Sequence, residues 1–183
     1  GAIKDFVILK LKNKINNKSF TNLINSYGTK IANLITILKT QLRNKKIIVY
    51  CHSPNLINNL QSILTSNKIS CSTFDNVTSS SHAIDEFKAD KQVLILSSKN
   101  NASGLNLQFA DAIILLQHIN DTYDNVKQLE HQIVGRLHRV GKTTPIKLIR
   151  LLVENTIEMD KFNYFNIISQ KNPVKIFPET TVV

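Results

Sequence analysis

The sequence predicts an α/β protein with a parallel sheet covered by helices on both faces. Short apolar runs typical of buried strands alternate with longer stretches in which apolar residues recur every three or four positions. The five runs lie at residues 47–50, 69–74, 92–97, 112–117 and 146–153. Strands that alternate with helices pair in parallel, because each crossover helix returns the chain to the same end of the sheet. We therefore expect one three-layer sandwich built on five buried strands.

Length and composition indicate a single domain without a membrane span or a metal site. The chain has 183 residues, of which 42% are hydrophobic, enough for one substantial core. Its longest apolar run, residues 112–116, is far shorter than the ~20 residues of a membrane span, and no signal peptide opens the sequence. Cys51 and Cys71 fall in strand-like runs without metal-site spacing. We expect a soluble, intracellular protein.

The positive charge is concentrated at the N-terminus. The net charge is +10, and residues 1–50 hold ten Lys or Arg against one acid, Asp5. Such a segment attracts a nucleic-acid backbone or forms a solvated face, and both interpretations are open from charge alone. We expect residues 1–26 to form a basic segment, residues 27–170 the main domain, and residues 171–183 a C-terminal tail.

The sequence pattern of the N-terminal residues fits more than one secondary structure. Residues 3–15 combine helical spacing with strand-like alternation, and we predict a helix. A short helix is expected at 20–26, ended by Gly28, and an amphipathic helix follows from Thr29, which is placed to cap it. After the first buried strand, residues 55–66 are expected to form its crossover helix. Ser81 is expected to cap a later helix that packs Ile84 and Phe87.

Two arginines stand near the end of a predicted helix at 129–137. Arg136 and Arg139 are three residues apart, a spacing that brings both guanidiniums near one helix face. The planar fork of donors in Arg suits phosphate oxygens. The alternative is a basic helix end that interacts favourably with the helix dipole and faces solvent.

The adjoining Gly141-Lys142-Thr143 is not a phosphate-binding P-loop. Such a loop needs four residues between its first glycine and the Gly-Lys-Thr, whereas five separate Gly135 from Gly141. No Asp-Glu pair follows an apolar strand to hold a magnesium ion. If the chain belongs to a nucleotide-driven motor, it therefore contains only the second lobe.

The segment around the two arginines resembles motif VI of superfamily II helicases, and most closely that of Snf-type translocases. The motif Gln-x-x-x-Arg-x-His-Arg-x-Gly is present, and Thr156-Ile157-Glu158 matches the Thr-Ile/Val-Glu that follows one strand later in that family. Lys142 replaces the family's usual Gln. The matching motif VI positions are Gln132, Arg136, His138, Arg139 and Gly141.

Two other segments carry the same resemblance. Residues 97–107 resemble motif V, with matches at Ser97, Ser98, Lys99, Gly104, Leu105, Asn106 and Leu107. Tyr50-Cys51-His52 stands where motif IV usually has Phe-Ser-Gln, which leaves Ser53 as the nearest hydroxyl for a phosphate contact. Before the first buried strand, residues 27–30 loosely resemble the Ser-Gly-Lys helix start of the Snf-type proteins.

The resemblance implies a RecA-like helicase C-terminal domain that works in an ATP-driven translocase on double-stranded DNA. It implies that a first lobe outside this sequence binds most of the ATP and Mg²⁺, and that the protein is nuclear or, for a large DNA virus, located in the viral factory or virion. The implied site residues are Arg136 and Arg139 as catalytic arginine fingers, Gln132, Gly104 and Asn106 at the ATP, and Ser53, Ser98 and Lys99 at the DNA.

Two further hypotheses remain from the sequence. The departures at Cys51, His52, Ser103 and Lys142 are compatible with a degenerate lobe that binds nucleic acid or protein without turnover. Retention of both arginines argues against it. A doubly wound small-molecule enzyme is the other possibility, although no Gly-rich phosphate loop or paired carboxylates support it.

Overall fold

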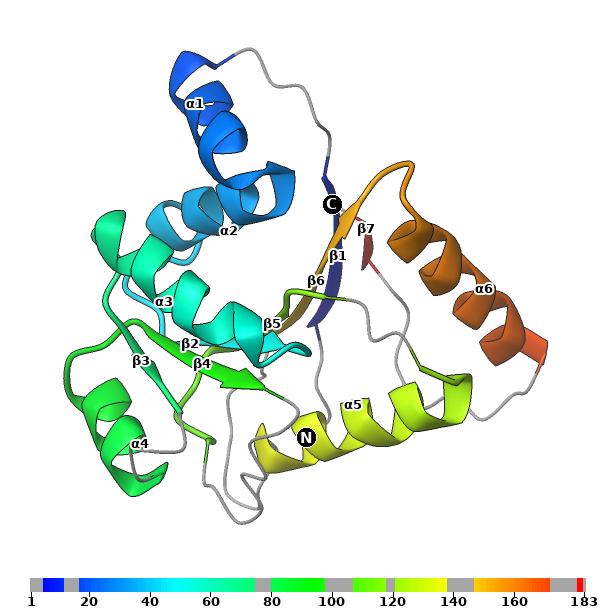
Figure 1. Cartoon of the computed structure of the whole chain (residues 1–183). Coiled ribbons are helices and arrows are strands. Elements are labelled where there is room, and N and C mark those ends of the chain that lie inside the picture. The colour runs from blue at the N-terminus through cyan, green and yellow to red at the C-terminus, as the bar shows by residue number, and fades with distance from the viewer. Residues whose placement is uncertain are drawn as a thin grey trace.

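A parallel sheet forms the middle layer of the chain in the computed structural model (Figure 1). The structure describes residues 5–11, 17–74, 80–97, 107–117, 121–137, 147–171 and 181–182, with only the backbone described at residues 5–11, 80, 130, 134–137, 166–171 and 181–182. In this part of the chain the strand order is β3-β4-β2-β5-β6-β1-β7, and every pairing is parallel. The strands are β1 (Asp5–Leu11), β2 (Ile47–Cys51), β3 (Cys71–Thr73), β4 (Val93–Ser97), β5 (Ala112–Leu115), β6 (Lys147–Val153) and β7 (Thr181–Val182).

Helices cover both faces of the sheet, as predicted. One face carries α2 and α3, and the other carries α4, α5 and α6, while α1 extends away from the sheet beyond α2 (Figure 1). The helices are α1 (Lys18–Tyr27), α2 (Thr29–Lys39), α3 (Asn55–Ser66), α4 (Ser80–Ala89), α5 (Tyr123–Leu137) and α6 (Ile157–Lys171). The three-layer α/β architecture is thus confirmed.

The central strands are buried on both faces, which explains their continuous apolar sequences. Every residue of β2, β4 and β5 is buried. Because side chains alternate along a strand, Val49 packs in the core under α2 and α3, while Ile48 packs in the core under α4 and α5. All five strands expected from the sequence are present.

The helix predicted for residues 3–15 is wrong, because Asp5–Leu11 forms strand β1. It pairs with β6 along its whole length, from Asp5 opposite Lys147 to Leu11 opposite Val153. The sequence of this segment fits either period, and hydrogen bonding to a strand more than 130 positions away selects the extended form. The basic N-terminal segment therefore contributes a strand to the main sheet. The C-terminal tail contributes as well, since β7 pairs with β1 at the sheet edge.

Three predicted helix starts need correction. Thr29 is the first residue of α2, and the capping position belongs to Gly28, whose φ of 82° suits glycine and allows α1 and α2 to meet there. Ser81 lies inside α4, which begins at Ser80. The third is α5, which begins at Tyr123, two turns before the predicted start, behind a turn in which the Asp121 carboxylate accepts hydrogen bonds from Thr122 and Asn125.

Candidate functional site

The segments in which motif IV and motif V were predicted begin at one edge of the sheet. Because all strands run in parallel, their carboxyl ends meet at the same edge, where open α/β sheets bind ligands. The chain leaves β4 at Ser97, β2 at Cys51 and β5 at Leu115, and these three strands are direct neighbours. The beginning of motif V, the segment resembling motif IV, and Gln117 therefore lie side by side.

Gln117 holds the loop that follows β2. Its side-chain oxygen accepts hydrogen bonds from the backbone N–H groups of His52, at 3.1 Å, and Ser53, at 3.2 Å. The backbone continues the connection, because Leu116 donates its N–H to the carbonyl of Tyr50 at 3.1 Å. Sequence reasoning missed this function of Gln117.

Cys51 and Ser53 differ sharply in exposure. Cys51 is fully buried in the core under α2 and α3, and burial raises the pKa of its thiol to about 12. It is therefore a neutral core residue that does not reach a ligand. Ser53 is half-buried immediately before α3, and its carbonyl accepts the N–H of Leu56 at 3.2 Å. A residue at a helix N-terminus lies where backbone amides and the helix dipole favour an anion.

The first and last residues of motif V, Ser97 and Leu107, are both buried. Ser97 is 2% exposed, and its hydroxyl has no hydrogen-bond partner among the residues that the structure describes. Leu107 is also 2% exposed and belongs to the core cluster under α4 and α5. The predicted DNA residues Ser98 and Lys99 and the predicted ATP residues Gly104 and Asn106 lie outside the described residues.

Helix α5 carries the first part of motif VI, as far as Leu137, and is anchored in the core. Val126 and Ile133, two turns apart, are 3% and 5% exposed, and Leu129 between them packs against the same core cluster as Ile133. Gln132 is exposed beside this anchor. Arg136 belongs to the last turn of α5, where only the backbone is described, and Arg139 lies outside the described residues.

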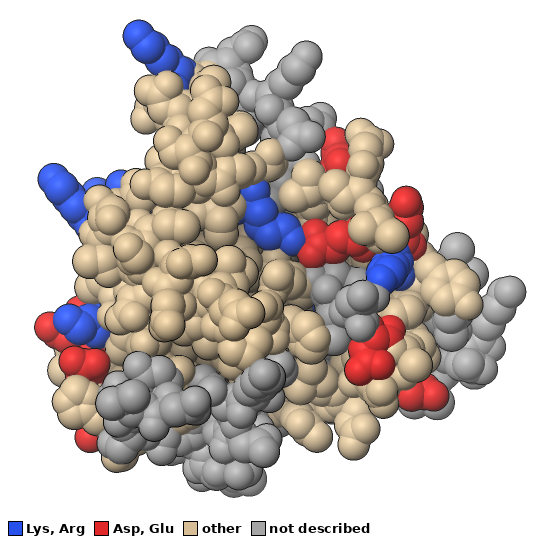
Figure 2. All heavy atoms as spheres, in the orientation of Figure 1, with Lys and Arg blue, Asp and Glu red and all other residues tan. Residues whose placement is uncertain are grey.

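An ion pair joins the start of α2 to the start of α6. The Lys30 ammonium contacts both carboxylate oxygens of Glu158, at 2.6 and 2.5 Å, and each side chain is 19% exposed. Burial lowers the pKa of Lys30, and the hydrogen bond and charge of Glu158 oppose that shift. Figure 2 shows basic and acidic side chains meeting where α2 approaches the first turn of α6. This pair connects two family-like segments that lie 128 positions apart in the sequence.

The ion pair forms one wall of a pocket at the carboxyl edge of the sheet. The pocket has a volume of about 390 Å³ and an apolar floor that includes Leu56 and Leu116. Gln117 also lines it, so the pocket adjoins the loop that this side chain holds. Ile157, at its mouth, is 73% exposed. The sequence hinted at this contact only through two separate resemblances, at Lys30 and Glu158.

We expect Glu158→Ala to lower the free energy of unfolding by about 1–3 kcal/mol, because it leaves the largely buried Lys30 ammonium without its partner. The double variant Lys30→Met/Glu158→Leu is expected to regain most of that loss, since it removes both charges. Urea unfolding of the parent, Lys30→Met, Glu158→Leu and the double variant measures the coupling, with Glu158→Ala unfolded beside them. Equal losses in the Glu158→Ala and double variants would contradict the assigned interaction.

Within the described ranges, no group of three or more His, Cys, Asp or Glu side chains is placed to hold a metal ion. None of the helices in this part of the chain has the length and hydrophobicity that crossing a bilayer requires.

Comparison with known proteins identifies the domain type. Residues 29–141 match the family model described as Helicase conserved C-terminal domain. The ATP-dependent helicase fft1 of Schizosaccharomyces pombe is 28% identical over 136 residues, which cover 72% of this chain and 14% of that protein. The SWI/SNF-related matrix-associated actin-dependent regulator of chromatin subfamily A containing DEAD/H box 1 of Xenopus tropicalis is 42% identical over 79 residues, 42% of this chain and 7% of that protein.

A solved structure supports the fold. The crystal structure of the C-terminal part of the Fun30 ATPase domain superposes with a TM-score of 0.62 and 22% sequence identity, over 82% of this chain and 47% of the solved chain. The chain thus corresponds to a small part of the two relatives and to about half of this solved chain.

Proposed function

The chain belongs to the helicase conserved C-terminal domain family, as the C-terminal lobe of an Snf-type helicase, and we propose that it completes the ATP site of a translocase on double-stranded DNA. The observation that carries the proposal is the family match over residues 29–141, which spans all three motif segments in the order the family requires. Membership in this family argues against a small-molecule enzyme.

The proposed role of each residue is assigned from the motif to which it belongs. In this proposal Arg136, in the last turn of α5, and Arg139, three residues later in the sequence, act on the γ-phosphate, and Gln132, Gly104 and Asn106 bind the nucleotide. A first lobe, which we propose as the direct partner, binds Mg²⁺ and most of the ATP, since this sequence has no P-loop spacing. When bound, ATP supplies the phosphoryl group whose transfer drives movement.

DNA contacts are proposed at the carboxyl edge of the sheet. Ser53 precedes α3 in a loop whose backbone Gln117 fixes, and a fixed loop holds a phosphate-contacting group in place at little entropic cost. Ser98 and Lys99 directly follow β4, the strand next to β2. We propose a nuclear or other intracellular location, in keeping with the DNA substrate.

A second candidate function is a binding module without turnover. The specific observation that favours it is Cys51, which stands at the family's Ser position and whose thiol is fully buried and neutral. In this hypothesis the carboxyl edge still binds nucleic acid, but the full-length protein hydrolyses no ATP.

We expect the isolated chain to hydrolyse ATP no faster than a protein-free blank, because it lacks a phosphate cradle. The full-length protein is expected to show hydrolysis that duplex DNA stimulates. Steady-state phosphate release from both proteins, with and without duplex, tests both statements. Turnover by the isolated chain that survives repurification would contradict the two-lobe assignment, and an inactive full-length protein would favour the binding module.

A further inference from the structure

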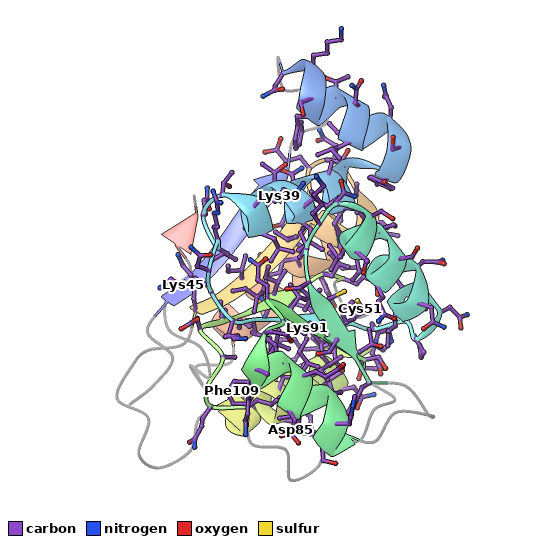
Figure 3. The ribbon with its side chains drawn as sticks, turned by 90° about the vertical axis from the view of Figure 1, so that its left-hand side faces the viewer. Lys39, Lys45, Cys51, Asp85, Lys91 and Phe109 are labelled. Carbon is purple, nitrogen blue, oxygen red and sulfur yellow. The ribbon has the colours of Figure 1, made fainter. Side chains whose placement is uncertain are left out.

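A basic pocket lies at the amino edge of the sheet, opposite the carboxyl ends of β2, β4 and β5. It has a volume of about 520 Å³ and is formed where the chain leaves α2, α3 and α4 and enters β2, β3 and β4. Figure 3 looks at this side of the molecule, with Lys39, Lys45 and Lys91 labelled around it. Nothing in the proposed motor function uses this edge.

Positive charge dominates the pocket. Its lining contains one carboxylate, that of Asp90, which lies 3.9 Å from the Lys91 ammonium. The cationic lining residues are Lys39, Arg43, Lys45, Lys46, Lys68 and Lys91. Lys39, Arg43, Lys45 and Lys68 are exposed, and none of these four forms an ion pair with another described residue.

An ordinary explanation of lysines at this edge is that they satisfy the carbonyl groups at helix C-termini. In this protein three other side chains already do so. At the end of α3 the Asn67 amide donates to the carbonyl of Ile63 at 2.8 Å. The Lys46 ammonium donates to the carbonyls of Phe87 at 2.5 Å and Lys91 at 2.7 Å. The Gln92 amide donates to the carbonyls of Leu38 at 2.8 Å and Leu42 at 3.0 Å. The four exposed cations are therefore not needed for that purpose.

The side chains that line the pocket indicate which class of anionic partner it binds. The apolar lining residues Leu38 and Ile69 are 0% and 2% exposed, so the surface offers no apolar anchor of the kind that a bound peptide uses. What remains is an array of long cationic side chains on separate turns around a concave surface. Arg43 adds a planar fork that matches phosphate oxygens.

We propose that this pocket binds the phosphate backbone of a nucleic-acid duplex, as a contact separate from the motif edge. Phosphate contacts need charge and reach but no base recognition, and each displaces condensed counterions. A lobe with anion-binding surfaces at both edges of its sheet can touch two segments of nucleic acid at once. The proposal stands independently of ATP hydrolysis.

Binding of a short blunt-ended duplex, measured by fluorescence anisotropy over a range of salt concentrations, tests the proposal. We expect Lys45→Gln and Lys68→Gln each to reduce the slope of log K against log salt by about one. Lys88→Gln is the matched control, since its ammonium lies outside the pocket lining, 5.0 Å from the Phe109 ring centroid. Thermal melts establish that each variant is folded. Slopes equal to that of the control would overturn the proposal.

Crosslinking locates the contact without relying on affinity. A benzophenone-bearing amino acid at position 90, where the Asp90 side chain is 73% exposed at the pocket, is expected to capture the duplex. The same group at Asn59, exposed on α3 and outside the pocket, is expected to capture none. Poly-glutamate is the competing probe. Capture of poly-glutamate but not of duplex at position 90 would reassign the pocket to an acidic protein partner and refute the nucleic-acid proposal.

Discussion

Replacing Arg139 with alanine in the complete two-lobe protein is expected to abolish DNA-stimulated ATP hydrolysis, with DNA binding and Tm nearly unchanged. In phosphoryl transfer the protein contributes mainly position and charge, and an arginine that stabilises the transferred group is worth ~10³-fold or more in rate. Arg139→Lys is expected to restore little, because an ammonium keeps the charge but loses the planar fork. Arg136→Ala is expected to behave similarly, since Arg136 precedes it by three residues at the end of α5.

Steady-state ATPase rates with and without duplex, measured beside thermal melts, separate three explanations. A catalytic arginine predicts lost turnover in a stable protein. A helix-dipole interaction predicts a small loss of stability, a few tenths to about 1 kcal/mol, with normal kinetics. A binding module predicts that the parent protein is already inactive. ATP hydrolysis by Arg139→Ala at the parental rate would refute the assignment of Arg139 as a catalytic arginine.

We expect Ile133→Ala to lower the free energy of unfolding by about 2–5 kcal/mol and Tm by roughly 5–15 °C. Ile133 is 5% exposed and packs in the core under α4 and α5, so truncation opens a cavity beneath the helix that carries Arg136. In the two-lobe protein we also expect a lower kcat well below Tm, because the loosened helix holds Arg136 less firmly in register with the nucleotide.

Two variants on the same helix serve as controls. Ile133→Leu keeps the apolar volume and is expected to cost less than about 1.5 kcal/mol. Gln128→Ala changes an exposed side chain and is expected to leave Tm and kcat nearly unchanged. Differential scanning fluorimetry and steady-state kinetics at one low temperature provide the measurements. A large loss of stability in Ile133→Ala with a parental kcat would show that the position of Arg136 does not depend on this anchor.

The central sheet was predictable because its strands lie among apolar neighbours on both faces. Residues 47–50 and 112–116 have no polar face, and a run this short with no polar side suits only a strand covered by helices on both sides. The buried positions Ile84 and Phe87 followed from helical spacing in the same way. The family and its motif segments also followed from sequence, since a motif is a local property of the chain. The roles of Arg136, Arg139 and the other predicted site residues remain predictions.

Local sequence could not predict the features that depend on contacts between distant segments of the chain. Residues 5–11 satisfy both helical and strand periods, and only pairing with β6 makes the strand favourable. The ion pair between Lys30 and Glu158 and the hydrogen bonds from His52 and Ser53 to Gln117 join positions 128, 65 and 64 residues apart. Apolar periodicity reports how each segment meets solvent, and so it determines strands, helices and core. Which polar side chains meet depends on strand order and helix placement, and these are fixed only when the whole sheet assembles.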